Sequence, residues 1–335
     1  MKGRLISILK VVVPLGIGIF VIWYQYDQLD DGQLAEIRES FANANYFWVA
    51  MSVLFGVLSH LSRAYRWNYM LEPLGYRTRF LNNFFAVMIG YVANIILPRF
   101  GEVWRCVMVS RYEKGTSFEK LFGTVVAERV ADLIILISIV AVVVIMQIAQ
   151  LKDRINELLQ GFFQNNTVIE LALKGFAAAL LIMIILYVGW RLLQRSQHPV
   201  FVRIRGLLKG LFDGVTSILR MKRKWAFLAH TAFIWIMYLA MFYVPFFALP
   251  ETCQASMSAV LAAFVMASFS IVLVQGGIGV YPVAVAQTLV LYSIPYEAGF
   301  AMGWIIWVAQ TIMIVVFGVV SLVLMPLLNA PAPKR

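Results

Sequence analysis

Three ionisable residues interrupt an apolar stretch at residues 119–149, namely Glu128, Arg129 and Asp132. On a helix, Glu128 and Asp132 share a face because they are four residues apart, whereas Arg129 points about 100° away. Ionisable side chains are rare within a membrane and usually pair or face a polar cavity, so this cluster is a candidate functional site. The alternative is that these charges lie in the first helical turns, near the cytoplasmic interface, and pair with one another.

A second group of charges surrounds a predicted break in the chain. Pro98 ends one helix, and Gly101 allows the chain to reverse. Glu102 and Arg105 then share a helical face. Arg99 and Arg105 offer planar, forked donors that suit two phosphate oxygens. We predict that these arginines bind an anion and that nearby carboxylates position them or carry a coupling proton; the alternative is an interfacial helix with solvated charges.

A glycine-rich turn lies in the last third of the chain, at Gly276, Gly277 and Gly279, shortly before Pro282. Proline is favoured in the first turn of a helix. Glycines allow several backbone N–H groups to face one point, and a helix N-terminus adds partial positive charge, so an anion could bind there. The spacing matches neither the P-loop nor the dinucleotide-binding pattern.

Basic and aromatic residues also end the second apolar run, at Arg63, Arg66 and Trp67. The preferred interpretation is an anchor at the cytoplasmic interface, with arginines extending to the headgroups and Trp67 in the aromatic belt. The alternative is that Arg63 and Arg66, together with Asn94, contact a lipid headgroup.

The composition predicts the elements that must position these residues. The chain has 335 residues, of which 61% are hydrophobic and 13% charged, with a mean hydropathy of +0.81. Ordinary soluble domains are roughly 45–50% apolar and about 25% charged. The sequence therefore predicts an all-α integral membrane protein in a single domain over residues 1–335, without a soluble catalytic domain.

Six apolar runs are long enough to cross a bilayer, and two others are not. The short runs, 82–97 and 282–294, adjoin the two breaks described above, which suggests re-entrant hairpins. We expect a helical bundle of six full spans plus two opposed re-entrant hairpins; the alternative is eight or more simple spans. One broken element in each half is typical of inverted-repeat transporters. The six expected spans are 6–24, 46–66, 119–149, 168–190, 225–248 and 297–325.

Charge predicts the orientation, because short cytoplasmic loops collect Lys and Arg. Residues 25–45 hold five acidic residues against one arginine and belong outside, whereas 63–79 hold four arginines against one glutamate and belong inside. Residues 191–224 hold nine basic residues against one aspartate, and within them 199–224 resemble an interfacial amphipathic helix. Both termini are then cytoplasmic.

Other kinds of chemistry have no support in the sequence. The two cysteines and three histidines form no metal-binding or nucleophile pattern, so we expect no metal, no cofactor and no catalytic residues. The formal charge of +11 follows membrane topology and does not indicate nucleic-acid binding. The apolar surface must face lipid in any case, and it therefore does not indicate an oligomeric state.

Four ordered motifs resemble the lysylphosphatidylglycerol synthase transmembrane-region family, the flippase-like part of the multiple peptide resistance factors. The resemblance covers about residues 5–325. The motifs are Arg63-x-x-Arg66-Trp67, Asn94-x-x-x-Pro98-Arg99-x-Gly101-Glu102-x-x-Arg105, Val126-Ala127-Glu128-Arg129-x-x-Asp132 and Gly276-Gly277-x-Gly279.

This resemblance implies a bacterial or archaeal inner-membrane protein that moves a lipid or its headgroup between leaflets. The expected ligand is an anionic phospholipid or a polyprenyl-phosphate lipid. In the full-length factors a C-terminal domain transfers lysine from its tRNA to phosphatidylglycerol; this chain ends at Arg335, so we expect no such domain. A membrane-embedded lipid-modifying transferase and an accessory membrane protein remain alternatives. The expected substrate-binding residues are Arg99, Glu102, Arg105, Glu128, Arg129, Asp132, Gly276, Gly277 and Gly279, with Arg63, Arg66 and Asn94 as further headgroup contacts.

Overall fold

The computed structural model describes residues 16–97, 100–113, 115–150, 191 and 221–329. All regular structure within these ranges is helical. After helical residues 16–28, the elements are α2 (Asp31–Asn43), α3 (Tyr46–Leu71), η1 (Glu72–Leu74), α4 (Phe80–Ile96), α5 (Phe100–Tyr112), α6 (Phe118–Gln150), α10 (Lys224–Tyr243), η2 (Val244–Ala248), α11 (Met257–Leu273), η3 (Gln275–Gly277), α12 (Val280–Val290) and α13 (Tyr296–Leu328).

The chain divides into two units. One combines Met1–Ile139 with Met221–Arg335, and the other is Val140–Arg220. The candidate residues in the described ranges all belong to the first unit. The predicted span 168–190 and the predicted amphipathic helix 199–224 fall almost entirely outside the described residues.

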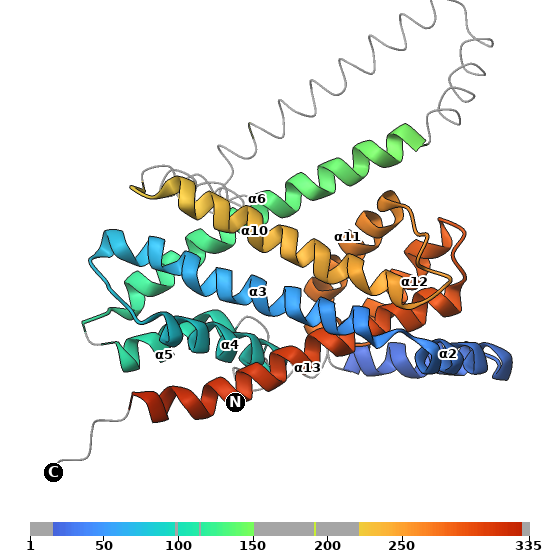
Figure 1. Ribbon diagram of the computed structural model, residues 1–335, viewed down its shortest axis with the longest axis horizontal. Helices are drawn as coiled ribbons and strands as arrows, with labels where there is room; N and C mark the ends of the chain where they lie inside the picture. The colour runs from blue at the N-terminus through green and yellow to red at the C-terminus, as the bar shows by residue number, and fades with distance from the viewer. Residues whose placement is uncertain (1–15, 98–99, 114, 151–190, 192–220, 330–335) are drawn as a thin grey trace, which may run out of the picture. The chain divides into compact units, whose positions relative to one another are not determined.

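Helices α3 and α10 lie side by side and antiparallel (Figure 1). Near the start of α3, the Ser52 hydroxyl donates to the carbonyl of Met241, close to the end of α10. Near the end of α3, Arg66 donates to the Thr231 hydroxyl in the first half of α10. This pair places the arginines of α3 against the polar residues of α10.

Helices α4 and α5 form an antiparallel hairpin. A Cβ added to Gly90 of α4 would lie only 2.9 Å from the carbonyl oxygen of Gly101 in α5, so the two backbones approach closely. The Asn94 side chain accepts a hydrogen bond from the Gly101 amide at 2.7 Å. It thereby satisfies one of the N–H groups that the first turn of α5 leaves without a helical partner.

A second hairpin, α11 and α12, turns at the glycine-rich segment. Gly276, Gly277 and Gly279 all have positive φ, between 64° and 72°. Side-chain-bearing residues adopt that conformation at a cost, which explains the glycines. Their backbone conformation lets the chain leave α11 and begin α12 within a few residues.

The long helix α13 packs against one arm of each hairpin. The first half of α13 contacts α12, where Gly299 faces Ala286. Its second half runs antiparallel to α4, where the side-chain amides of Asn329 and Asn82 pair at 2.8 Å. The hairpins therefore open toward opposite ends of α13. Their tips meet near its middle, because Gln275 donates to the Ile95 carbonyl at 2.6 Å.

Four described helical segments are long and apolar enough to cross a membrane: Tyr46–Leu74, Phe118–Gln147, Lys224–Ala248 and Tyr296–Leu328. They correspond to four of the six predicted spans. The shorter apolar helices are Phe80–Ile95, Met257–Leu273 and Val280–Val290, at the two predicted breaks. The all-helical membrane fold is confirmed, whereas the number of crossings remains a prediction. Helix α2 was not among the predicted elements, and its N-terminus carries an Asp30–Gln33 capping box.

Candidate functional site

The two carboxylates of α6 lie inside the protein and bind arginines from α3. Glu128 and Asp132 are 0% and 7% exposed. Arg63 Nη1 lies 2.5 Å from Glu128 Oε1 and 2.6 Å from Asp132 Oδ2. Arg66 Nη2 lies 3.2 Å from the Glu128 carboxylate and 3.0 Å from that of Asp132. The predicted shared face of Glu128 and Asp132 is therefore the face that binds α3.

Arg105 of α5 reaches the same cluster from another direction. Its Nη1 lies 3.1 Å from Glu128 Oε2, and the centre of its guanidinium lies 3.7 Å from the centroid of the Trp67 ring. Such a cation–π contact is favourable where water is excluded. The Trp67 indole donates to the Thr124 hydroxyl at 2.8 Å, which fixes the ring beneath Arg105.

These contacts define a buried charge network of three arginines and two carboxylates. Arg63, Arg66 and Arg105 are each 3% exposed or less. Burying an ion is costly unless it is paired. Three arginines face two carboxylates, so the buried charge network as a whole carries one positive charge in excess.

A more exposed ion pair lies beside this network. Arg129 Nη2 lies 3.1 Å from Glu102 Oε1, and the two side chains are 42% and 22% exposed. Arg129 also approaches Asp132, at 3.9 Å. When Arg129 and Glu102 are added to the buried charge network, four arginines face three carboxylates.

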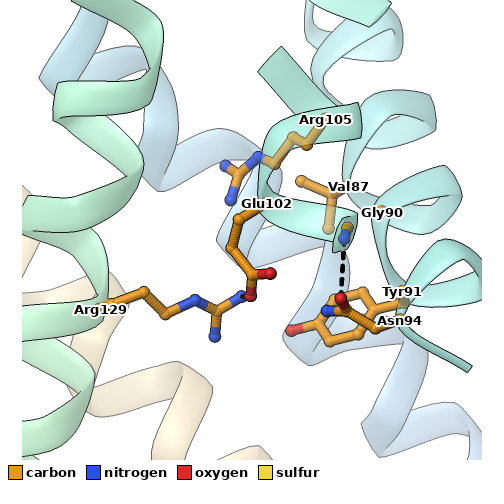
Figure 2. A pocket seen from close by; sticks show the side chains of 8 residues that line it. Val87, Gly90, Tyr91, Asn94, Glu102, Arg105 and Arg129 are labelled. Carbon is orange, nitrogen blue, oxygen red and sulfur yellow. Dashed lines mark hydrogen bonds and ion pairs between the residues drawn. The ribbon is translucent and has the colours of Figure 1, made fainter. Parts of the chain in front are cut away.

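Figure 2 shows a pocket at this point, between α4, α5 and α6. It holds about 220 Å³ of empty space, including the part that is open to the surroundings. The enclosed part of this space has room for only about one water-sized group, so the pocket is a narrow polar crevice. It is lined by Val87, Gly90, Tyr91, Asn94, Gly101, Glu102, Arg105 and Arg129.

Two of these residues keep unused hydrogen-bonding groups that are buried. Arg105 Nε and Nη2 and Glu102 Oε2 are all buried and have no hydrogen-bond partner among the described residues. Polar groups buried without a partner destabilise a protein, and a ligand is one way to satisfy them.

A pair of tyrosines connects the pocket to the buried charge network. Tyr91 lines the pocket, and its hydroxyl lies 3.1 Å from the hydroxyl of Tyr238 on α10. Arg63 in turn donates to the Tyr238 hydroxyl at 3.2 Å. Sequence reasoning missed both tyrosines, because in an aromatic-rich membrane protein no local pattern separates them from the others.

The structure brings together most of the predicted site residues. Glu102, Arg105 and Arg129 line the pocket, and Glu128 and Asp132 lie behind it in the buried charge network. Asn94 also lines the pocket, where its side-chain oxygen is engaged by α5. The role of each as a ligand-binding residue remains a prediction.

Arg63, Arg66 and Trp67 do not form the interfacial anchor that the sequence favoured. All three side chains are buried, and the arginines bind carboxylates rather than extending to headgroups. That interpretation was wrong because local spacing showed the arginines at the end of an apolar run but not the carboxylates of α6. Arg99 lies outside the described residues, so its predicted phosphate contact stays a prediction.

The glycine turn does not line the pocket. The Gly277 amide donates to the Val274 carbonyl within the turn, and the Gly276 carbonyl accepts from the Trp307 indole at 2.6 Å. The predicted binding of an anion by Gly276, Gly277 and Gly279 therefore stays a prediction.

Comparison with known proteins places the chain in a family. The model of the family described as lysylphosphatidylglycerol synthase TM region matches residues 11–318. The chain belongs to this family. A UPF0104 membrane protein from Methanocaldococcus jannaschii is 32% identical over 105 residues, which is 30% of each chain. The match thus spans less than a third of that curated relative. No solved structure matches the chain.

The family match confirms the resemblance that the four ordered motifs indicated. This lysylphosphatidylglycerol synthase TM-region protein is a helical membrane protein of a lipid-related family. The matched range includes α2 through most of α13, and therefore the pocket and the buried charge network.

Proposed function

We propose that this protein moves an anionic phospholipid or a polyprenyl-phosphate lipid between the leaflets of a bacterial or archaeal inner membrane. The observation that carries the proposal is Arg105, a buried arginine with unused donors that faces a pocket between α4, α5 and α6. A guanidinium binds phosphate through two parallel hydrogen bonds. Arg129, at the more exposed side, adds a second positive charge.

The two hairpins give this pocket a setting typical of transporters. We propose that they enter the membrane from opposite sides. Helices of 17 and 13 residues in the first hairpin, and of 17 and 11 in the second, are about 26 Å long or less, against a hydrocarbon core of roughly 30 Å. Transporters with inverted repeats place their sites where such broken helices meet. Contact between the tips, through Gln275 and Ile95, supports this arrangement.

The test is leaflet exchange in proteoliposomes. Labelled phosphatidylglycerol, lysyl-phosphatidylglycerol and a polyprenyl phosphate are supplied in parallel to wild-type protein and to Arg105→Gln. The matched control is Arg111→Gln, which removes the same charge from an exposed position on α5. Arg105→Gln should fold because Glu128 retains Arg63 and Arg66 as partners. Arg111→Gln should fold because Arg111 is exposed.

We expect at least one lipid to exchange in wild-type vesicles, at a rate that Arg105→Gln lowers about tenfold or more and Arg111→Gln leaves unchanged. A charged hydrogen bond worth about 1.5–3 kcal/mol corresponds to a change of that size. If folded wild-type protein exchanges none of the lipids, with or without a proton gradient, the proposed function is wrong.

A further inference from the structure

Two residues that line the pocket keep unused polar groups of opposite kinds. Arg105 Nε and Nη2 are donors, and Glu102 Oε2 is an acceptor; none of these buried atoms has a partner in the part of the chain that the structure describes. Both residues belong to α5, three positions apart, and both line the same pocket. Figure 2 shows the Glu102 carboxylate directed toward Arg129, with Arg105 beside it.

A bare anion would satisfy only one of these groups. Its oxygens could accept from Arg105, but they would place further negative charge beside the Glu102 carboxylate and leave Oε2 without a donor. A buried acceptor without a donor keeps its desolvation cost. The pocket is thus mismatched to a group that only accepts hydrogen bonds.

The position of the Glu102 carboxylate is fixed by its neighbour. Its Oε1 binds Arg129 at 3.1 Å, so the second oxygen, Oε2, is held as a buried, unpaired atom of a residue that lines the pocket. The positive charges of Arg105 and Arg129 also face this carboxylate and keep the local balance positive. A phosphate can therefore bind at Arg105 while a neighbouring hydroxyl or ammonium donates to Glu102.

We propose that the pocket selects phosphodiester headgroups whose alcohol carries a hydrogen-bond donor, and that Glu102 recognises this donor. This inference rests on the proposed function and names the substrate class of the same site. Arg105 would bind the phosphate that such lipids share. Glu102 would distinguish lipids by the part of the headgroup beyond the phosphate.

The experiment compares two lipids that differ in that donor. Phosphatidylglycerol and phosphatidylethanol both carry one negative phosphodiester, but the ethyl group has no hydroxyl. Their exchange rates are measured in proteoliposomes with wild-type protein, Glu102→Ala and Glu119→Ala. Glu119 is the control because it is exposed, lies in the first turn of α6 and is bonded to Ser117. The readout is the ratio of the two rates within one preparation, which does not depend on the amount of folded protein.

We expect wild-type protein and Glu119→Ala to move phosphatidylglycerol about tenfold faster than phosphatidylethanol, and Glu102→Ala to bring this ratio close to one. Equal wild-type rates would overturn the inference and leave the proposed function standing. A wild-type preference that persists in Glu102→Ala would also overturn it. If neither phosphatidylglycerol, phosphatidylethanol nor any lipid of the preceding experiment moves, both proposals fail.

Discussion

At the scale of single residues, the described part of the chain contains two kinds of carboxylate–arginine contact. Glu128 is completely buried and contacts Arg63, Arg66 and Arg105, whereas Glu102 is partly exposed and pairs with Arg129. Breaking a buried pair leaves uncompensated charge inside the protein, whereas an exposed pair contributes little. Neutralising Glu128 should therefore lower the free energy of unfolding more than neutralising Glu102 does.

We predict that Glu128→Gln lowers the free energy of unfolding by about 3–5 kcal/mol, because Arg63 and Arg66 would then keep only Asp132 and Arg105 would lose its carboxylate partner. Glu102→Gln should cost about 1 kcal/mol or less. The measurement is denaturant or thermal unfolding of purified protein in detergent, with both variants in the same detergent. Equal losses of stability would show that the buried charge network does not hold the helices together.

At the scale of elements, the first hairpin depends on close packing between α4 and α5. A Cβ on Gly101 would lie 2.7 Å from the Asn94 side chain, and it would also overlap the Gly90 carbonyl oxygen. Small residues permit such an approach between membrane helices. The same contact forms one wall of the pocket, since Gly90, Asn94 and Gly101 all line it.

We predict that Gly101→Ala destabilises the protein by about 1–3 kcal/mol, as expected for an overpacked contact. It should also lower lipid exchange, because α5 carries Arg105 and Glu102. The control is Gly123→Ala on α6, where an added Cβ meets no atom within 4 Å. Melting temperature and exchange rate are measured for both. A Gly101→Ala protein as stable and active as Gly123→Ala would contradict the close packing.

At the scale of the whole molecule, the orientation inferred from charge can be tested with the native cysteines. Cys253 is exposed between η2 and α11, whereas Cys106 is buried in α5. If residues 25–45 lie outside and the predicted spans alternate from there, Cys253 lies on the outer face.

A membrane-impermeant maleimide should therefore label wild-type protein in right-side-out vesicles, and Cys253→Ser should abolish the labelling. Cys106→Ser should leave it unchanged. Labelling only after the vesicles are opened would place this loop in the cytoplasm. The predicted orientation of the second hairpin would then be reversed.

The sequence by itself determined the membrane class, the positions of the four long helices that the structure describes, and the two breaks. These follow from local properties: run length, hydropathy, proline and glycine. It also indicated that Glu128 and Asp132 share a face, since helical periodicity requires this. The family followed from ordered motifs along one chain.

Only the tertiary structure decided which charges meet. Arg63 and Arg66 are more than sixty positions from Glu128 in sequence, and no local spacing relates the two helices. No local spacing relates Trp67 to Arg105, or Gln275 to Ile95, although each pair is in contact. Arginines that look like surface anchors in sequence become buried partners because packing of α3 against α6 and α10 removes them from water and lipid. Ion pairing depends on distance in space, which the fold alone sets.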